Sequence, residues 1–280
     1  MKLATFEQGG SSGWGIVEGD AIRDMRGLLP QYPTLKALIA GDGMAAAREA
    51  AKSAPLLPLA EISWLPVIQD PAKILCCGLN YVEHREETNN PVVGHPTIFV
   101  RFADAQNGHE RDVIHPPETA HMDFEAELAV IIGKGGRRIP REQAYEAVAG
   151  YACYNDISIR NWQRHTTQMT PGKNFPTCGP FGPWMVTPDE VGELAPLSIK
   201  LRLNGEVMQD AHLGDMIFDV PALIAYCSTF TTLNPGDVII TGTPGGVGQR
   251  RDPQVFMKPG DVVEVEIEKV GLLRNRIVAE

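Results

Sequence analysis

Strand-like segments separated by turn residues dominate the chain from residue 96 onward. They lie at residues 96–102, 123–133, 145–159, 198–209, 236–242 and 261–278. In the last segment Val263, Val265 and Ile267 alternate with glutamates, which is typical of a strand with one buried and one wet face. Asn204 and Gly205 are the preferred pair for a two-residue hairpin turn. Many strands with few helices favour a mainly β fold, as a sandwich or roll.

The first part of the chain has a different pattern. Its short strands are predicted at residues 2–7, 14–19 and 21–25, followed by an alanine-rich helix over 34–54 that glycines interrupt. Turn residues near position 70 then give way to an apolar strand. We therefore predict a small N-terminal α+β domain over residues 1–69 and a larger domain over residues 70–280.

One helix is clear in the larger domain. Asp219 can cap it, Pro221 fits its first turn, and an apolar run fills it as far as the Asn-Pro-Gly-Asp turn that starts at Asn234.

The composition excludes several classes of protein. A formal net charge of -10, with no run of Lys or Arg to offset it, argues against nucleic-acid binding. The chain has neither a signal-peptide pattern nor an apolar run of membrane-spanning length. Its 5 cysteines show no paired CxxC spacing. We interpret them as reduced thiols in a cytoplasmic protein.

Three acidic residues alternate along one predicted strand. In "DFEAELAVII", Asp123, Glu125 and Glu127 share a face whose phase continues with Ala129 and Ile131. On a surface strand, every residue of the solvent-facing side would be polar. Here the same face continues with apolar residues that are typical of a core. Some other group must therefore compensate the charge of these acids.

A metal ion is one way to compensate them. Glu125 and Glu127 have Cα atoms roughly 6 to 7 Å apart in a strand, so both carboxylates can reach one cation. Asp156, in the next strand-like run, is the best third ligand. Three carboxylates suit a hard ion such as Mg²⁺ or Mn²⁺, with Ca²⁺ as an alternative. The competing interpretation is a salt-bridge network with Arg137, Arg138 or Arg160.

A second reactive pair is predicted on a short helix. Asn80 can cap this helix with Glu83 three places on, and His84 and Glu87 then share one face. A carboxylate that holds one imidazole nitrogen leaves the other free to act as a base. The alternative is an ordinary surface contact. Lys173 lies in a Gly/Pro-rich loop without a neighbouring base.

Two other patterns are weaker indications of a binding site. The glycine-rich turn at residues 238–248 lacks the Gly-Lys-Ser/Thr ending of a nucleotide-binding loop. The histidines of the loop from residue 108 to 121, His109, His115 and His121, remain a rival metal site, although they lack a closely spaced pair.

Seven stretches, taken in chain order, resemble the fumarylacetoacetate hydrolase family across roughly residues 70–280. They are "GLNYVEH", "DFEAELAVIIGKGGRRI", "GYACYNDISIRNWQ", "PGKNF", "GPFGPWMVT", "LRLNGEVMQ" and "GDVIITGTPGGVG". The resemblance implies a mixed β-sandwich roll whose mouth holds a divalent ion. It also implies a homodimer, and it makes Glu125, Glu127 and Asp156 the metal ligands.

The resemblance also implies roles for the other polar residues. His84 and Glu87 match a water-activating pair, and Lys173 matches a lysine that stabilises developing negative charge. Further positions match groups that face substrate or water: Tyr81, Arg160, Gln163 and Thr243. Where many members have Lys-Pro, this chain has Arg101-Phe102, and we expect Arg101 to grip a substrate carboxylate. We also expect His109 to line the pocket.

The implied activity is hydrolysis of a carbon-carbon bond in an acylpyruvate-like 1,3-diketo acid, in the catabolism of aromatic or related compounds. Alternatives at the same site are decarboxylation, isomerisation or hydration of a 2-oxo or 2-hydroxymuconate-type acid. A protein that binds keto acids with a metal but does not turn them over is a further alternative, against which His84 and Lys173 argue.

Overall fold

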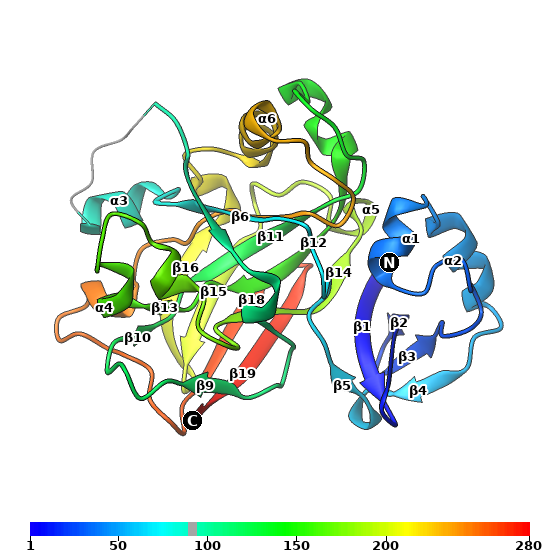
Figure 1. The fold of residues 1–280 in the computed structure, drawn as a ribbon, viewed down its shortest axis with the longest axis horizontal. Helices are drawn as coiled ribbons and strands as arrows, with labels where there is room; N and C mark the ends of the chain where they lie inside the picture. Colours follow the sequence, from blue (N-terminus) through cyan, green and yellow to red (C-terminus); the bar gives the residue numbers. More distant parts are fainter. Residues whose placement is uncertain (89–93) are drawn as a thin grey trace.

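A mixed twelve-stranded sheet is the largest element of the computed structural model, which describes residues 1–88 and 94–280 (Figure 1). The strands across it are β4 (Leu56–Pro58), β3 (Ala21–Asp24), β2 (Ser11–Glu18), β1 (Lys2–Gln8), β14 (Gly179–Val186), β12 (Val148–Asn155), β11 (Ala126–Ile132), β17 (Val238–Ile240), β6 (Ile74–Gly78) and β7 (Thr97–Arg101), with β5 (Ser63–Trp64) on β1 and β8 (Gln106–Asn107) on β14. The predicted mainly β fold is confirmed.

A second sheet packs against the central part of the first. Its strands are β16 (Glu206–His212), β15 (Ser198–Leu203), β18 (Val262–Ile267), β19 (Gly271–Ala279) and β9 (Val113–His115). Leu128 and Val130 of β11 share one buried cluster with Leu201 of β15 and Val265 of β18. The apolar faces of the two sheets therefore form one core, which is the predicted sandwich.

The hairpin between β15 and β16 forms where it was predicted. Leu203 pairs with Glu206, and Asn204 and Gly205 between them have φ of 52° and 84°. Both values lie in the left-handed region that Asn and Gly tolerate best, which explains why this pair makes the turn.

The N-terminal segment extends the large sheet from one side (Figure 1). Lys2 and Leu3 of β1 pair antiparallel with Val186 and Met185 of β14. The predicted interrupted helix is present as α1 (Leu35–Ala40), which Thr34 caps, and α2 (Met44–Ala51). Because β1 is hydrogen-bonded to β14, one sheet runs through both parts of the chain. The division into two domains near residue 70 stays a prediction.

Short helices complete the structure. They are α3 (Val82–Thr88), α4 (Arg160–Gln163), α5 (Pro188–Val191) and α6 (Val220–Phe230), with 3₁₀ turns η1 (Leu59–Glu61), η2 (Ala103–Ala105), η3 (Arg141–Ala147), η4 (Thr170–Lys173), η5 (Leu213–Asp215) and η6 (Gly248–Arg250). As predicted, Asp219 caps α6 by accepting from Ala222 N at 2.9 Å, and Pro221 lies in the first turn. None of the described helices is long and apolar enough to cross a membrane. The cytoplasmic location and the homodimer stay predictions.

The acidic strand differs from its prediction. Instead of one strand from Asp123, the structure has β10 (Met122–Asp123), paired with β13 (Ser158–Ile159), and a separate β11 that starts at Ala126. The break falls at Phe124 and Glu125. The alternation of faces therefore does not continue across the break, and the side chain of Asp123 does not share the face of Glu125 and Glu127.

Candidate metal centre and active site

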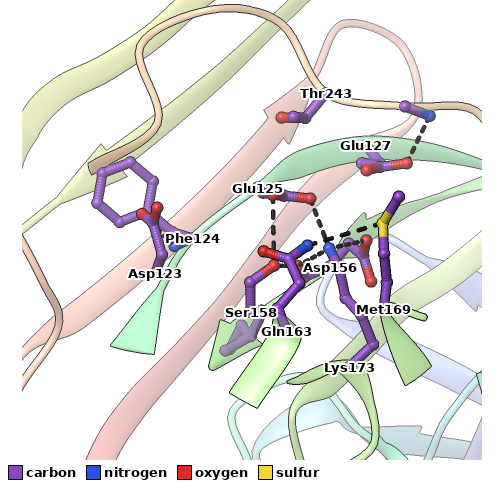
Figure 2. Close-up of polar contacts among 12 residues, drawn as sticks. Asp123, Phe124, Glu125, Glu127, Asp156, Ser158, Gln163, Met169, Lys173 and Thr243 are labelled. Carbon is purple, nitrogen blue, oxygen red and sulfur yellow. Dashed lines mark hydrogen bonds and ion pairs between the residues drawn. The ribbon is translucent and has the colours of Figure 1, made fainter. Parts of the chain in front are cut away.

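Three carboxylates meet at the break between β10 and β11. Glu125, Glu127 and Asp156 are all buried, and one oxygen of each lies within 4.8 Å of the others. Backbone pairing brings them together, because β12 runs antiparallel to β11 and Asp156 N donates to Glu125 O at 2.9 Å. Figure 2 shows Asp156 below the two glutamates. Among the described residues this is the one group of three potential metal ligands, so the histidines of the 108–121 loop form no such group.

The electrostatics of this cluster fit a bound cation. Burial, followed by the charges of Asp156 and Glu125, raises the pKa of Glu127 well above its ordinary value. Three carboxylates at this separation repel one another strongly in a buried site. A hard divalent ion with oxygen ligands removes this repulsion, and the donor set matches Mg²⁺ or Mn²⁺.

Basic side chains also surround the cluster. Lys173 Nζ lies 2.8 Å from Glu125 Oε2 and 2.5 Å from Asp156 Oδ2. Arg160 Nη1 lies 2.7 Å from Glu125 Oε1, and Arg101 Nη1 lies 2.5 Å from Asp156 Oδ1. The salt-bridge interpretation is therefore partly right, since Arg160 is one of the partners that it named. A metal ion and a salt-bridge network are compatible here.

The pKa values follow from these contacts. Burial alone would raise the pKa of Glu125, but the charges of Lys173 and Arg160 hold it well below its usual range. Burial lowers the pKa of Lys173, yet the charges of Asp156 and Glu125 outweigh burial and raise it. These two carboxylates therefore favour the charged form of Lys173.

The predicted His84 and Glu87 pair lies beside the cluster. His84 Nδ1 is 2.6 Å from Glu87 Oε1, and Glu87 Oε2 accepts from Gly246 N at 2.9 Å. An ionised carboxylate only accepts hydrogen bonds, so Nδ1 carries the proton and Nε2 is left as the basic nitrogen. Glu87 thus fixes the ring between α3 and the glycine-rich turn.

Asn80 anchors the start of α3 differently from its prediction. Its amide nitrogen donates to the carbonyls of Phe218 and Thr241, and its Oδ1 accepts from Phe218 N. These contacts join three segments that are remote in the sequence, which a helix-cap pattern does not predict.

A pocket of about 270 Å³ opens onto these groups. The predicted residues that line it are His84, Glu125, Glu127, Arg160, Gln163, Lys173 and Thr243. Gln163 Oε1 accepts from Arg160 Nη1 at 3.1 Å, and Thr243 Oγ1 accepts from Gln209 Nε2 at 2.8 Å. Figure 2 shows Thr243 on the opposite side of the glutamates from Gln163 and Lys173.

Three residues that we expected at the substrate do not line this pocket. Arg101 has a fully buried side chain behind Asp156, where Nη2 also contacts Cys178 Sγ at 2.8 Å. His109 packs edge-on against Trp64 and accepts from Arg274 N. Tyr81 is 1% exposed at the base of α3. The lining of this pocket therefore lends no support to the substrate contacts that we expected of these three residues, and those contacts stay predictions.

Asp123 is not part of the ligand cluster. Its Oδ2 lies 2.7 Å from Arg160 Nη2, and its oxygens accept from Gly248 N and Gln249 N at 2.8 and 3.0 Å. Figure 2 shows it turned away from Glu125. Asp123 therefore joins α4 to η6, a role that the alternating pattern concealed.

Sequence patterns missed two arginines of the pocket. Arg164 follows α4 and Arg250 ends η6, and both line the cavity with exposed side chains. They are 86 positions apart, and neither stands in a recognisable motif, so no local signal connects them.

Comparisons with known proteins show which family this chain belongs to. Residues 73–278 match the family model described as fumarylacetoacetate (FAA) hydrolase C-terminal. The chain is 41% identical to "Oxaloacetate tautomerase FAHD2A, mitochondrial" of Bos taurus, over 99% of this chain and 92% of that protein. It is also 41% identical to "2,4-didehydro-3-deoxy-L-rhamnonate hydrolase" of Sphingomonas sp. (strain SKA58), over 99% and 96%.

A solved structure is also similar to this chain in fold and sequence. It is the maleylpyruvate hydrolase of Sphingobium sp. SYK-6 in complex with manganese (II) ion and pyruvate. It superimposes with a TM-score of 0.83 at 33% identity, over 100% of this chain and 99% of that one. The protein described here is an enzyme of the fumarylacetoacetate hydrolase family.

Proposed function

We propose that this enzyme hydrolyses a carbon-carbon bond in an acylpyruvate-like 1,3-diketo acid with a divalent cation held by Glu125, Glu127 and Asp156. The observation that carries the proposal is the position of His84, which lines the same pocket as the acidic cluster and is fixed by Glu87. The relative that holds manganese and pyruvate supports both the cation and a product of this type.

Each group in the pocket has a separate task in the proposed reaction. The cation supplies Lewis-acid stabilisation of the 2-oxo acid end of the substrate. His84 Nε2 takes a proton from water, whose oxygen attacks the distal carbonyl carbon. The bond between that carbon and the next one breaks, its electron pair stays on the pyruvate fragment as an enolate, and a proton there completes pyruvate. The other product is a carboxylic acid.

Lys173 and Gln163 assist these steps. Lys173 lies within hydrogen-bond distance of Glu125 and Asp156 at the edge of the pocket, where its ammonium group can stabilise negative charge that develops on the substrate. Gln163 is held by Arg160 and presents an amide to the pocket, where it can orient the water or the substrate. Thr243, held by Gln209, binds the substrate from the opposite side.

Tautomerisation of a 2-oxo acid is the second candidate, and the 41% identity to a named oxaloacetate tautomerase favours it. This reaction moves a proton between carbon and oxygen and consumes no water. The two candidates therefore differ in what they require of His84.

The experiment compares both activities in wild type and His84→Ala with saturating Mn²⁺. We expect acetylpyruvate hydrolysis to fall by about 10² to 10⁴, the usual worth of a positioned general base. His115→Ala, a histidine outside the pocket lining, is the matched control. Hydrolysis that survives in His84→Ala within a few-fold would remove His84 from the mechanism. Oxaloacetate tautomerisation without any acetylpyruvate hydrolysis in wild type would favour the second candidate.

A further inference from the structure

Two guanidinium groups of the pocket lack an acidic partner. Within residues 1–88 and 94–280, no carboxylate oxygen lies within 4.0 Å of a side-chain nitrogen of Arg164 or Arg250. By contrast, Arg101 and Arg160 are both in buried ion pairs. The chain carries 35 acidic and 25 basic residues, so acids to pair with these two arginines are not scarce. Both side chains are exposed and line the pocket.

The structure holds both arginines at one place. Asp123 accepts from Arg160 Nε in α4 and from the backbone nitrogens of Gly248 and Gln249 in η6. Arg164 directly follows α4, and Arg250 is the last residue of η6. One buried carboxylate therefore ties together the two short elements that carry the unpaired charges.

The two charges also act on each other. Burial lowers the pKa of Arg164, and the nearby positive charges of Arg250 and Arg160 lower it further. Glu125 and Glu127, at the metal-binding end, are the only carboxylates among the described residues that line this pocket. Away from that end, the described lining thus has excess positive charge that an anion would neutralise.

We infer that Arg164 and Arg250 bind a second carboxylate at the far end of the substrate, so that the enzyme prefers 2-oxo acids that carry a distal carboxylate. The inference rests on the proposed function, because it takes the metal-binding end as the site of the 2-oxo acid. A volume of about 270 Å³ suits a small organic acid whose two ends reach both groups.

The test uses ligands that cannot be hydrolysed as 1,3-diketones. Calorimetry with the Mn²⁺-loaded protein compares 2-oxoglutarate with 2-oxopentanoate, in which a methyl group replaces the distal carboxylate. 2-Oxoadipate and 2-oxohexanoate form a second pair with one more methylene, so that two distances between the 2-oxo acid end and the distal group are tested. We expect the dicarboxylate of at least one pair to bind about 10- to 100-fold more tightly.

Variants assign the preference to the two arginines. In the double variant R164Q/R250Q the ratio of the two Kd values should fall to within about threefold. R276Q removes the same charge from an exposed arginine outside the pocket and should keep the wild-type ratio. Equal Kd values within both pairs in wild type, or a preference that persists in R164Q/R250Q, would overturn the inference and leave the proposed function intact. If no 2-oxo acid binds with Mn²⁺ present, the proposed function fails and the inference fails with it.

Discussion

Arg101 and Asp156 form a fully buried ion pair, with 2.5 Å between Nη1 and Oδ1. The other oxygen of Asp156 lies 2.5 Å from Lys173 Nζ, so this carboxylate is held between two positively charged side chains. Burial lowers the pKa of the Arg101 guanidinium, but Cys178, Tyr154 and Asp156 raise it well above its usual value. Arg101 contacts Asp156 on the side away from the pocket, so the ion pair holds the Asp156 carboxylate close to Glu125 and Glu127.

Removing Arg101 should therefore affect stability first. Arg101→Met leaves Asp156 with less compensation in a buried site, and we expect the free energy of unfolding to fall by about 3–5 kcal/mol. Urea unfolding measures it, with Arg276→Met as the exposed control, which should change stability by less than about 0.5 kcal/mol. A stable Arg101→Met protein with a raised KM would instead restore the expected substrate contact.

Loss of one ligand should abolish tight cation binding. Glu127→Gln keeps the shape of the side chain but removes a charge from the three-carboxylate cluster. We expect the Kd for Mn²⁺, measured by calorimetry on the folded variant, to rise by at least about 10²-fold. Glu86→Gln changes an exposed acid of α3 and should bind Mn²⁺ like wild type. Equal Kd values in the two variants would exclude Glu127 as a ligand.

Glu87 should act through His84. In Glu87→Gln the ring can turn or change its tautomer, because an amide no longer demands a proton on Nδ1. We expect kcat for acetylpyruvate to fall by about 10- to 10³-fold with KM nearly unchanged, since Glu87 contacts the base and not the substrate. Mn²⁺ binding serves as the control for an intact site. A change confined to KM would place Glu87 against the substrate.

His109 should make stability depend on pH. Burial, with the charge of Arg274, lowers its pKa from 6.5 to about 4, so the unfolded state binds a proton at higher pH than the folded state. Above the pKa of His109 in the unfolded state, this effect does not reduce the free energy of unfolding. As pH falls from about 6.5 to 4, the free energy of unfolding falls by roughly 3 kcal/mol.

The variant His109→Gln isolates this effect. Glutamine cannot gain the proton and can still accept from Arg274 N. Urea unfolding between pH 7 and 4.5 should show a steeper loss of stability in wild type than in the variant. Parallel curves for the two proteins would contradict the assignment.

The sequence predicted those parts of the site that local spacing determines. Glu125 and Glu127 are two positions apart at the start of β11, and Asp156 directly follows the neighbouring strand β12, so spacing and chain order indicated one cluster. His84 and Glu87 are three positions apart on a helix and meet for the same reason. The β-sandwich followed from alternation and turn residues.

Contacts between remote segments could not be predicted in this way. Asp123 has the same spacing as Glu125, yet the strand breaks between them and Asp123 pairs with Arg160 and η6 instead. Arg101 was expected to grip a substrate carboxylate because it stands where many family members have Lys-Pro, and only the position of Asp156 behind the pocket explains its burial. Packing of distant elements decides both cases.

The fate of water oxygen tests the central proposal most directly. Acetylpyruvate is incubated with the Mn²⁺-loaded enzyme in H₂¹⁸O, and the acetate and pyruvate are analysed by mass spectrometry. We predict equal amounts of the two products and one ¹⁸O atom from solvent in the acetate carboxylate, because water attacks the distal carbonyl carbon. Acetylpyruvate that remains uncleaved, while the same preparation tautomerises oxaloacetate, would contradict the proposed hydrolysis.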